Sequence, residues 1–385
     1  MDVLLKEVFE DDFWIMPQTP QYLESGVPYI TSKNIKKGKI DFGNVNYISE
    51  EDYQTISKNR PIKEGDILIS MIGTLGEIAV VKLEDGKFYG QNMFLIRLNK
   101  EKVYDRYFLN YFNSNKVKRD LERSQNQSTQ RYLKANHIED LMIPLPSLDE
   151  QRFIAKILDS LSDIIKKRHK ELEELDNLIK SRYVELFGNP LDPYKVNYIF
   201  TECVEFNPKK SEVKDLQDVE VSFVPMECVG VDGSFTIKGT GLISDYYSGY
   251  TYFRDGDVLL AKITPCFENG KVAIAIDCKN GIGFGTTEFH VSRPLKGITN
   301  SVWVKYLLKN DMVHDLATIN MSGSAGQKRI QTPFFNKLKV YVPPIEEQEQ
   351  FADFVHQVTK LKFEVQKSLD ETQTLMDSLM QQYFG

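Results

Sequence analysis

The chain contains few cysteines, no long apolar run and no basic leader. The four cysteines are Cys203, Cys228, Cys266 and Cys278. None of them forms a CxxC pair, so a structural zinc site is not expected. The most apolar stretch, residues 67–81, is broken by Gly73, Gly76 and Glu77, and the first residues are acidic where a signal peptide is basic. These absences predict a soluble, cytoplasmic protein without a membrane span.

Motifs for catalysis are missing as well. No GxxxxGK[ST] phosphate loop exists, because the nearest match has Pro265 where the first glycine belongs. The glycine-rich Gly281–Gly285 lacks the context of an S-adenosylmethionine loop and is better explained as a flexible hairpin between two strands. The Asn-Pro pairs at Asn189 and Asn207 lack the surroundings that hold a flipped base. We therefore expect no catalytic residue, metal or cofactor on this chain.

The balance of charge limits the kind of partner. The net charge is -7, which argues against a protein that coats nucleic acid non-specifically, because that binding grows with the lysines and arginines presented to phosphates. A local basic surface stays compatible with this balance. With 385 residues and 41% hydrophobic residues, the chain is long and apolar enough for two or three globular domains.

One junction is written twice. The stretch "PLPSLDEQ", Pro144–Gln151, is followed 197 positions later by "YVPPIEEQ", Tyr341–Gln348. From these junctions to Gly188 and to Gly385 the two segments align without a gap, and neither contains an internal proline or glycine. Ser147 and Glu150 have capping-box spacing, which predicts where the first helix begins. Each segment therefore predicts one helix of roughly 55 Å, at about 1.5 Å per residue.

Apolar residues recur along both segments in alternating steps of three and four, as in a coiled-coil seam. The stripe of the first segment is Leu158, Leu161, Ile165, Arg168, Leu172, Leu175, Ile179, Arg182 and Leu186. That of the second is Phe354, Val358, Leu361, Val365, Ser368, Thr372, Leu375 and Leu379. An antiparallel pair whose partner numbers add to 540 would bring most apolar positions together. Packing of each helix on its own domain or on a partner subunit is the alternative.

Weaker echoes lie upstream of each junction. "GDILISMIG" at 65–73 resembles "GDVLLAKIT" at 256–264, and "GEIAV" at 76–80 resembles "GKVAI" at 270–274. These short, β-branched runs between Gly-Asp turns are typical of strands. The predicted division is therefore a domain at 1–146, a helix at 147–188, a second domain at 189–343 and a helix at 344–385. The expected fold is α+β, with two similar mixed domains separated by two long antiparallel coiled-coil helices in a pseudo-two-fold arrangement.

Duplex DNA is the ligand that such an arrangement fits best, because its recognition centres repeat about every 34 Å on one side of the helix. Polar loops that differ between the domains could read different bases. Amides could pair with adenine and Arg131 with guanine or phosphate, whereas the basic pair Lys328 and Arg329 favours phosphates. A solvated loop without a ligand is the alternative. The candidate DNA-binding residues of the first domain are Lys33, Asn34, Lys36, Lys37, Gln125, Asn126, Gln127, Ser128, Thr129, Gln130 and Arg131. Those of the second are Lys262, Thr264, Ser322, Ser324, Gln327, Lys328 and Arg329.

The chain resembles the specificity subunit of type I restriction-modification systems. The resemblance rests on the two junctions of proline, acidic residues and glutamine, on the "LFG" and "YFG" helix ends, and on the "GDILIS" and "GDVLLA" runs. The resemblance covers nearly the whole chain, although little precedes the first domain here. It implies a non-catalytic subunit that reads a bipartite DNA target across a fixed gap. It also implies two modification subunits, which carry S-adenosylmethionine and methylate adenine at N6, and allows two restriction subunits. The alternative is a coiled-coil adaptor whose globular domains bind other proteins.

Overall fold

The structure, a computed structural model, describes residues 1–11, 14–16, 20–36, 38–72, 76–125, 132–324 and 326–385. Its contacts group the chain into two compact units. Unit 1 comprises residues 1–169 and 367–385, and unit 2 comprises residues 170–366. Each unit thus holds one mixed domain together with a part of each long helix. The four-segment division expected from the sequence follows chain order and stays a prediction.

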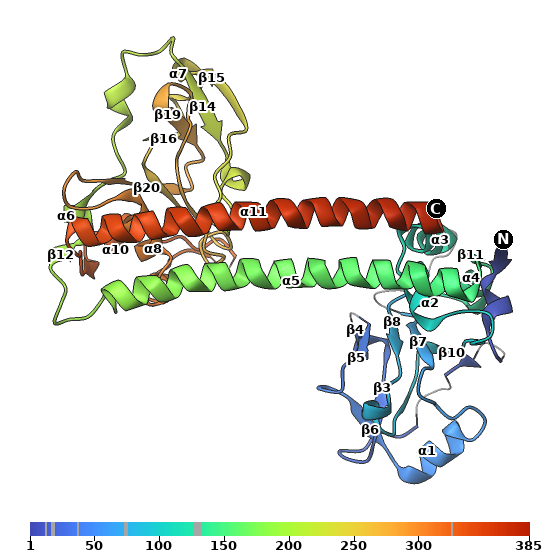
Figure 1. The fold of residues 1–385 in the computed structure, drawn as a ribbon. Coiled ribbons are helices and arrows are strands. Elements are labelled where there is room, and N and C mark those ends of the chain that lie inside the picture. The colour runs from blue at the N-terminus through green and yellow to red at the C-terminus, as the bar shows by residue number, and fades with distance from the viewer. Residues whose placement is uncertain (12–13, 17–19, 37, 73–75, 126–131, 325) are drawn as a thin grey trace. The chain divides into compact units, whose positions relative to one another are not determined.

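Unit 1 contains a four-stranded antiparallel sheet in the order β2-β10-β7-β8 and a three-stranded sheet in the order β6-β3-β9 (Figure 1). Two short pairs, β1 with β11 and β4 with β5, complete it. Its strands are β1 (Asp2–Leu4), β2 (Trp14–Ile15), β3 (Val27–Ile30), β4 (Ile35–Lys36), β5 (Lys39–Ile40), β6 (Asn46–Ile48), β7 (Ile67–Ser70), β8 (Ile78–Val80), β9 (Tyr89–Gly90), β10 (Met93–Ile96) and β11 (Met142–Pro144). Its helices are α1 (Glu50–Ser57), α2 (Asp105–Phe112), α3 (Asn115–Gln125) and α4 (Ala135–Glu139).

Unit 2 contains one four-stranded sheet in the order β13-β20-β17-β18 and another in the order β15-β14-β19-β16. A short pair of β12 with β21 matches the pair of β1 with β11 in unit 1. Its strands are β12 (Tyr198–Ile199), β13 (Val204–Phe206), β14 (Glu220–Val224), β15 (Gly239–Leu242), β16 (Thr251–Arg254), β17 (Val258–Ala261), β18 (Val272–Ile274), β19 (Ile282–Gly285), β20 (Phe289–Pro294) and β21 (Lys339–Val340). Its helices are α6 (Phe200–Cys203), α7 (Ile243–Tyr246), α8 (Ser301–Leu308), α9 (Asp311–Ile319) and α10 (Thr332–Phe335).

The two units are copies of one α+β plan, as the sequence echoes predicted. In each, one central strand pairs antiparallel on both sides: β7 with β8 and β10, and β17 with β18 and β20. Ile67 and Ile69 pack into one apolar core while Leu68 packs into another. Because successive side chains of a strand point to opposite faces, a sheet between two cores requires a continuous apolar run. This requirement explains the two matching apolar stretches.

The glycine-rich segment 281–285 is not a flexible hairpin, and that prediction was wrong. Residues Ile282–Gly285 form β19, a fully buried strand between β14 and β16. A Cβ atom at Gly283 would lie 2.1 Å from Cε2 of Phe253, and one at Gly285 would lie 2.5 Å from the carbonyl oxygen of Val224. The glycines are needed because neighbouring groups approach the strand closely, not because the chain must bend.

The repeated junction fastens each long helix to its domain. The helices are α5 (Leu148–Phe187) and α11 (Ile345–Phe384), and the predicted capping box of Ser147 and Glu150 is present. Gln151, fully buried, accepts from the backbone N–H of Tyr104 at 2.8 Å and donates to the carbonyls of Lys102 and Pro146 at 3.0 and 2.9 Å.

Gln348 repeats this set of bonds in unit 2. It accepts from Asn300 at 3.0 Å and donates to the carbonyls of Ile298 and Pro343, both at 2.8 Å. Its side chain is also fully buried. In each unit the junction glutamine thus satisfies three backbone groups that no longer reach water, which gives the repeated sequence a structural reason.

A buried ion pair between aspartate and arginine is also present in both units. Asp66, 1% exposed, binds the guanidinium of Arg97 through two hydrogen bonds of 2.7 and 2.8 Å. Asp257, equally buried, binds Arg293 through two of 2.9 Å. Both aspartates follow a glycine with positive φ, which is the conformation that the turn before each central strand requires. None of the described helices is both long enough and apolar enough to cross a bilayer.

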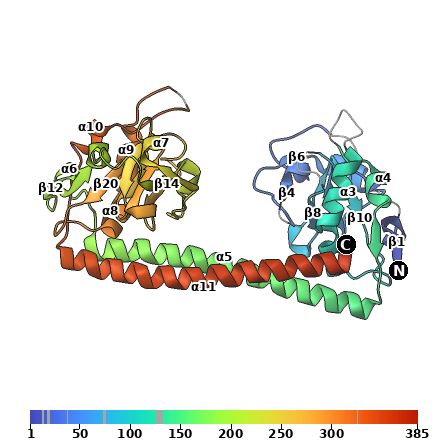
Figure 2. The same cartoon turned by 90° about the horizontal axis from the view of Figure 1, so that it is seen from above.

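Within unit 2 the long helices run antiparallel, side by side in both views (Figures 1 and 2). Phe351 packs against Tyr183 and Phe187, and Lys362 forms an ion pair with Asp176 at 2.6 Å. The numbers of these partners add to 534 or 538, so the register differs from the predicted 540. Within unit 1, Phe384 joins the same apolar core as residues 154–158 of α5.

The predicted stripe of α11 is partly wrong. Leu361 and Leu375 are 56% and 50% exposed, whereas Leu369 is 5% exposed. The inward stripe runs through 351, 355, 358, 362, 365 and 369, and it therefore includes the charged Lys362. The apolar periodicity of the sequence predicts that Leu361, rather than Lys362, lies on the inner face. Lys362 is tolerated inside because Asp176 neutralises it, and sequence periodicity cannot show that pairing.

Candidate nucleic-acid interface

Most of the candidate residues of unit 2 are brought together at one place, where the segment following β17 meets the loop 322–330. The backbone N–H of Ile330 donates to the carbonyl of Lys262 at 2.9 Å, and that of Thr264 donates to Lys328 at 3.0 Å. The loop closes as a hairpin through two bonds between Ser322 and Arg329. We call residues 262–264, Glu288 and 322–330 the polar edge of unit 2.

The polar edge of unit 2 carries more positive than negative charge. The side chains of Ser322, Ser324, Gln327 and Lys328 are exposed on this loop. Arg329 is bound by Glu288, with Nε and Nη2 donating to the carboxylate at 3.0 and 2.9 Å. This hydrogen bond holds the pKa of Glu288 below its usual range, and Lys262 acts in the same direction. Arg329 and Lys262 therefore both favour the ionised form of this carboxylate.

Unit 1 has an equivalent polar edge, built by the same backbone bonds. The N–H of Leu133 donates to the carbonyl of Met71 at 3.0 Å, and the N–H of Met71 donates to that of Asn92 at 3.1 Å. In unit 2 the corresponding bonds are Ile330 to Lys262 and Lys262 to Glu288, both at 2.9 Å. Asn92 thus stands where Glu288 stands. The polar edge of unit 1 comprises, among the described residues, 71–72, Asn92 and 132–133.

Several predicted residues of unit 1 lie outside the described part of the chain. These are Lys37, Asn126, Gln127, Ser128, Thr129, Gln130 and Arg131, together with the side chain of Gln125. The backbone on both sides of this loop, at α3 and at Leu133, is described. Those residues stay predictions.

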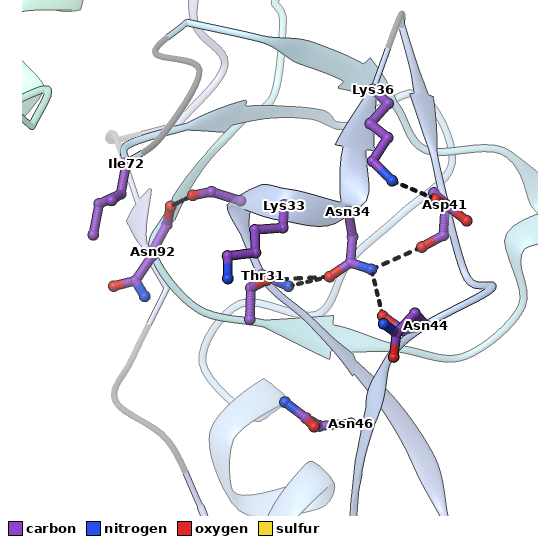
Figure 3. A pocket seen from close by; sticks show the side chains of 10 residues that line it. Thr31, Lys33, Asn34, Lys36, Asp41, Asn44, Asn46, Ile72 and Asn92 are labelled. Atoms are coloured by element: carbon purple, nitrogen blue, oxygen red, sulfur yellow. Dashed lines mark hydrogen bonds and ion pairs between the residues drawn. The ribbon is translucent and has the colours of Figure 1, made fainter. Parts of the chain in front are cut away.

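Beside Asn92, unit 1 is hollowed by a cavity of about 650 Å³ (Figure 3). Its walls are rich in amides and contain two of the predicted lysines. The lining residues are Thr31, Ser32, Lys33, Asn34, Lys36, Asp41, Asn44, Asn46, Ile72 and Asn92. The hydroxyl of Ser32 donates to the carbonyl of Asn92, which ties the cavity to the polar edge of unit 1. Amide groups can offer a donor and an acceptor side by side, as the edge of adenine requires.

Asn34 is engaged inside the domain rather than offered to a ligand. Its oxygen accepts from the backbone N–H of Thr31 at 2.9 Å, and its nitrogen donates to the carbonyls of Asp41 and Asn44 at 2.9 and 3.0 Å (Figure 3). The side chain is 7% exposed. Asn34 therefore stabilises the cavity wall. The side chain of Asn44 is exposed and is more accessible to a ligand than that of Asn34.

The two lysines of the cavity differ. Lys36 forms an exposed ion pair with Asp41 at 2.8 Å, and its hydrogen bond lowers the pKa of that carboxyl. Such a pair is weak in water and can be exchanged for a phosphate. Lys33 is exposed on the cavity wall (Figure 3).

Sequence reasoning missed Glu288, Asn44, Asn46 and Asn92. Glu288 and Asn92 could have been found by extending the internal repeat, because each directly precedes a matching strand, β20 or β10. The offset between the copies changes along the domains, so the match is visible only after the strands have been paired. Asn44 and Asn46 lie in a loop and the short strand that follows it, and they carry no recognisable motif.

Two copies of one α+β domain, each with a polar edge and each fastened to a long helix, define a duplicated domain-and-spacer protein. Known proteins share this design. The family model for the type I restriction modification DNA specificity domain matches the chain twice, at residues 3–175 and 200–372. The chain therefore belongs to the type I restriction modification DNA specificity family.

Individual relatives agree with this assignment. The EcoAI specificity subunit of Escherichia coli is 40% identical over 188 residues, which cover 47% of this chain and 31% of that protein. The putative MjaX specificity subunit of Methanocaldococcus jannaschii is 26% identical over 377 residues, covering 91% of this chain and 86% of that one. The match to the Escherichia coli relative thus spans about a third of that protein's length.

Solved structures show the same fold. A chain from work on complex assembly and conformational transition of the type I R-M system covers 100% of this chain and 97% of its own length. Its TM-score is 0.58 at 20% identity. The type I restriction-modification S subunit from M. genitalium covers 100% of this chain and 96% of its own, with a TM-score of 0.55 at 14% identity.

Proposed function

We propose that this chain is the DNA-reading specificity subunit of a type I restriction-modification complex. Each domain contacts one short half-site, mainly through its polar edge. The observation that supports this most directly is the duplicated polar edge, in which matching backbone bonds carry unlike side chains, Asn92 in unit 1 and Glu288 with Arg329 in unit 2. Two domains with the same backbone structure but different side chains at the contact surface could read two different base sequences.

The long helices would set the gap between the half-sites and dock the modification subunits. Exposed apolar side chains on both helices, such as Phe153 at 63% and Phe363 at 68%, favour contact with other chains. The modification subunits would bind S-adenosylmethionine and methylate a flipped adenine at N6. This chain would contribute binding and positioning without catalytic groups of its own. Restriction subunits, where present, would join the same complex.

The decisive experiment maps methylated adenines genome-wide in cells with and without this chain. We expect one bipartite target with a fixed gap, present only with the chain. Binding of purified complex to that duplex should weaken with salt and should be lost when one base pair is inserted into the gap. An adaptor for proteins would change no methylation pattern and would show no preferred gap.

Two variants test the assignment of the parts. Gln130→Ala or Arg131→Ala should change the bases preferred in one half-site and leave the other unaltered. Deleting seven residues, two helical turns, from α5 should shift the tolerated gap or prevent assembly. A full-strength complex with an unchanged gap would contradict the role of the helices as a spacer.

A further inference from the structure

The guanidinium of Arg329 is held in one orientation by Glu288. Nε donates to Oε2 at 3.0 Å and Nη2 to Oε1 at 2.9 Å, while Nη1 donates to the carbonyl of Gln327 at 3.1 Å. Glu288 is fixed in turn at the start of β20, where its N–H bonds to the hydroxyl of Thr286 and its carbonyl accepts from Lys262. An arginine on an exposed hairpin is thereby set before any ligand arrives.

The bonds to Glu288 occupy one edge of the fork, and the bond to Gln327 uses one further N–H on Nη1. A guanidinium has five N–H groups, and the contacts to Glu288 and Gln327 use three of them. Among the described residues, the two remaining N–H groups, one on Nη1 and one on Nη2, have no partner. The Nη2 hydrogen that is left faces away from Glu288, toward Nη1, at the end of the fork. The side chain is 34% exposed, so this end is accessible from solvent.

Comparison with unit 1 argues against a purely structural role for the Arg329–Glu288 pair. In unit 1 the same backbone ladder forms without the ion pair, since Tyr132 stands at the position of Arg329 and Asn92 at that of Glu288. By contrast, the junction glutamines and the Asp66–Arg97 and Asp257–Arg293 pairs occur in both units. Contacts that the fold needs are kept in both copies, whereas this pair is particular to one.

We propose that Arg329 reads a guanine in the half-site bound by unit 2 and that Glu288 is its positioning residue. This inference rests on the proposed function and deepens it by naming a base. The N–H groups left on Nη1 and Nη2 are two donors, which is the number that the N7 and O6 acceptors of guanine require in the major groove. Adenine offers one acceptor beside a donor, thymine one acceptor beside a methyl group and cytosine a donor, so none of them satisfies both N–H groups. The sequence alone had assigned Arg329 to phosphate, and the bound, oriented fork revises that.

The test uses the full chain in complex with its modification subunits, and reads base preference at every target position by methylation sequencing and duplex binding. Wild type should prefer guanine at one position of one half-site by about 5- to 150-fold, the range of a bidentate contact. Arg329→Lys keeps the charge but removes the fork, and should reduce that preference to less than about 5-fold. The other half-site must be read as before, which shows that the variant is folded.

Two further variants separate positioning from charge. Glu288→Gln should lower the guanine preference without weakening overall binding, because it frees the fork and removes a negative charge near the phosphates. A merely structural Glu288 would lower the melting temperature and leave the preference intact. Lys328→Ala, the matched control, should weaken binding to all sequences alike.

Three results would overturn the inference while leaving the proposed function standing: a half-site of unit 2 without guanine, an Arg329→Lys complex with unchanged preferences, or one with equal weakening for every sequence, as for a phosphate contact. A wild-type complex without any bipartite target would instead overturn the proposed function itself.

Discussion

Replacing Gln348 by glutamate tests whether the repeated junction holds each long helix in place. The glutamine donates two hydrogen bonds to carbonyls and accepts one from an N–H, all fully buried. Glutamate keeps the acceptor, loses both donors and places a carboxylate against two carbonyl oxygens. Each lost bond costs about 1 kcal/mol, and the unpaired buried groups add about 1–3 kcal/mol. We expect a loss of roughly 3–5 kcal/mol at pH 8.

The pH dependence has a definite sign. Burial against carbonyl oxygens should raise the pKa of the new carboxyl in the folded state. A protonated carboxyl regains one donor, so the stability that it restores is present at low pH and lost as pH rises through the raised pKa. Gln348→Glu should therefore be less damaging at pH 5 than at pH 8. Gln348→Met, which cannot ionise, should be destabilising without this dependence.

Differential scanning calorimetry measures the effect. For a unit of this size a loss of 3–5 kcal/mol lowers the melting temperature by roughly 6–20 °C. Gln350→Glu adds the same charge to an exposed position of the same helix and should stay within about 0.5 kcal/mol of wild type. If Gln348→Glu unfolds like that control, or loses the same stability at pH 5 and pH 8, the junction does not act as described.

Other predictions concern unit 2. Asp257→Asn should cost about 1–3 kcal/mol in denaturant unfolding, because it removes the buried carboxylate from Arg293, which keeps only its partly exposed ion pairs with Glu205 and Glu212. Burial lowers the pKa of Lys305 to about 8, so the folded state binds fewer protons than the unfolded state above that pH. Stability should rise with pH between about 8 and 10, and Lys305→Met should reduce that rise in unfolding curves, while the lowered pKa of the partly buried Lys309 leaves part of it. Burial raises the pKa of the Cys203 thiol to about 12, so this thiol should react slowly with thiol reagents at pH 8. The half-buried Cys266 should be labelled first, and peptide mapping of the labelled protein measures the order.

The parts of the fold that follow from local rules were predictable from the sequence. The absence of helix breakers over about 37 residues was enough to predict α5 and α11, a capping box marked where α5 begins, and matching Gly-Asp turns were enough for the central strands. Predictions failed where a distant group decides the outcome. Lys362 lies on the inner stripe because of Asp176, and Gly283 lies in a strand because of Phe253. Neither partner is near in sequence.

The site was predictable only as a region. Loop 322–330 was identified by its composition, yet composition could not separate residues that hold the loop from residues that face a ligand. Asn34 and Arg329 show this difference. Both were candidates, but the amide of Asn34 is bonded within its own domain, while the guanidinium of Arg329 keeps two N–H groups without a partner among the described residues. The difference lies in the hydrogen-bond partners, which only the folded chain assembles.

Comparison of the two copies gives a rule for separating architecture from recognition. Buried polar contacts that appear in both units, such as those of Gln151 and Gln348, satisfy backbone groups of the frame, and changing one costs folding energy. Polar contacts at the edges differ between units while the backbone ladder beneath them stays the same. On the proposed function, a substitution at an edge should therefore change what is bound with little cost to the fold. Because each edge is built within its own unit, the same proposal predicts that one half-site can change without the other, so that a single chain acquires a new bipartite target in two independent steps.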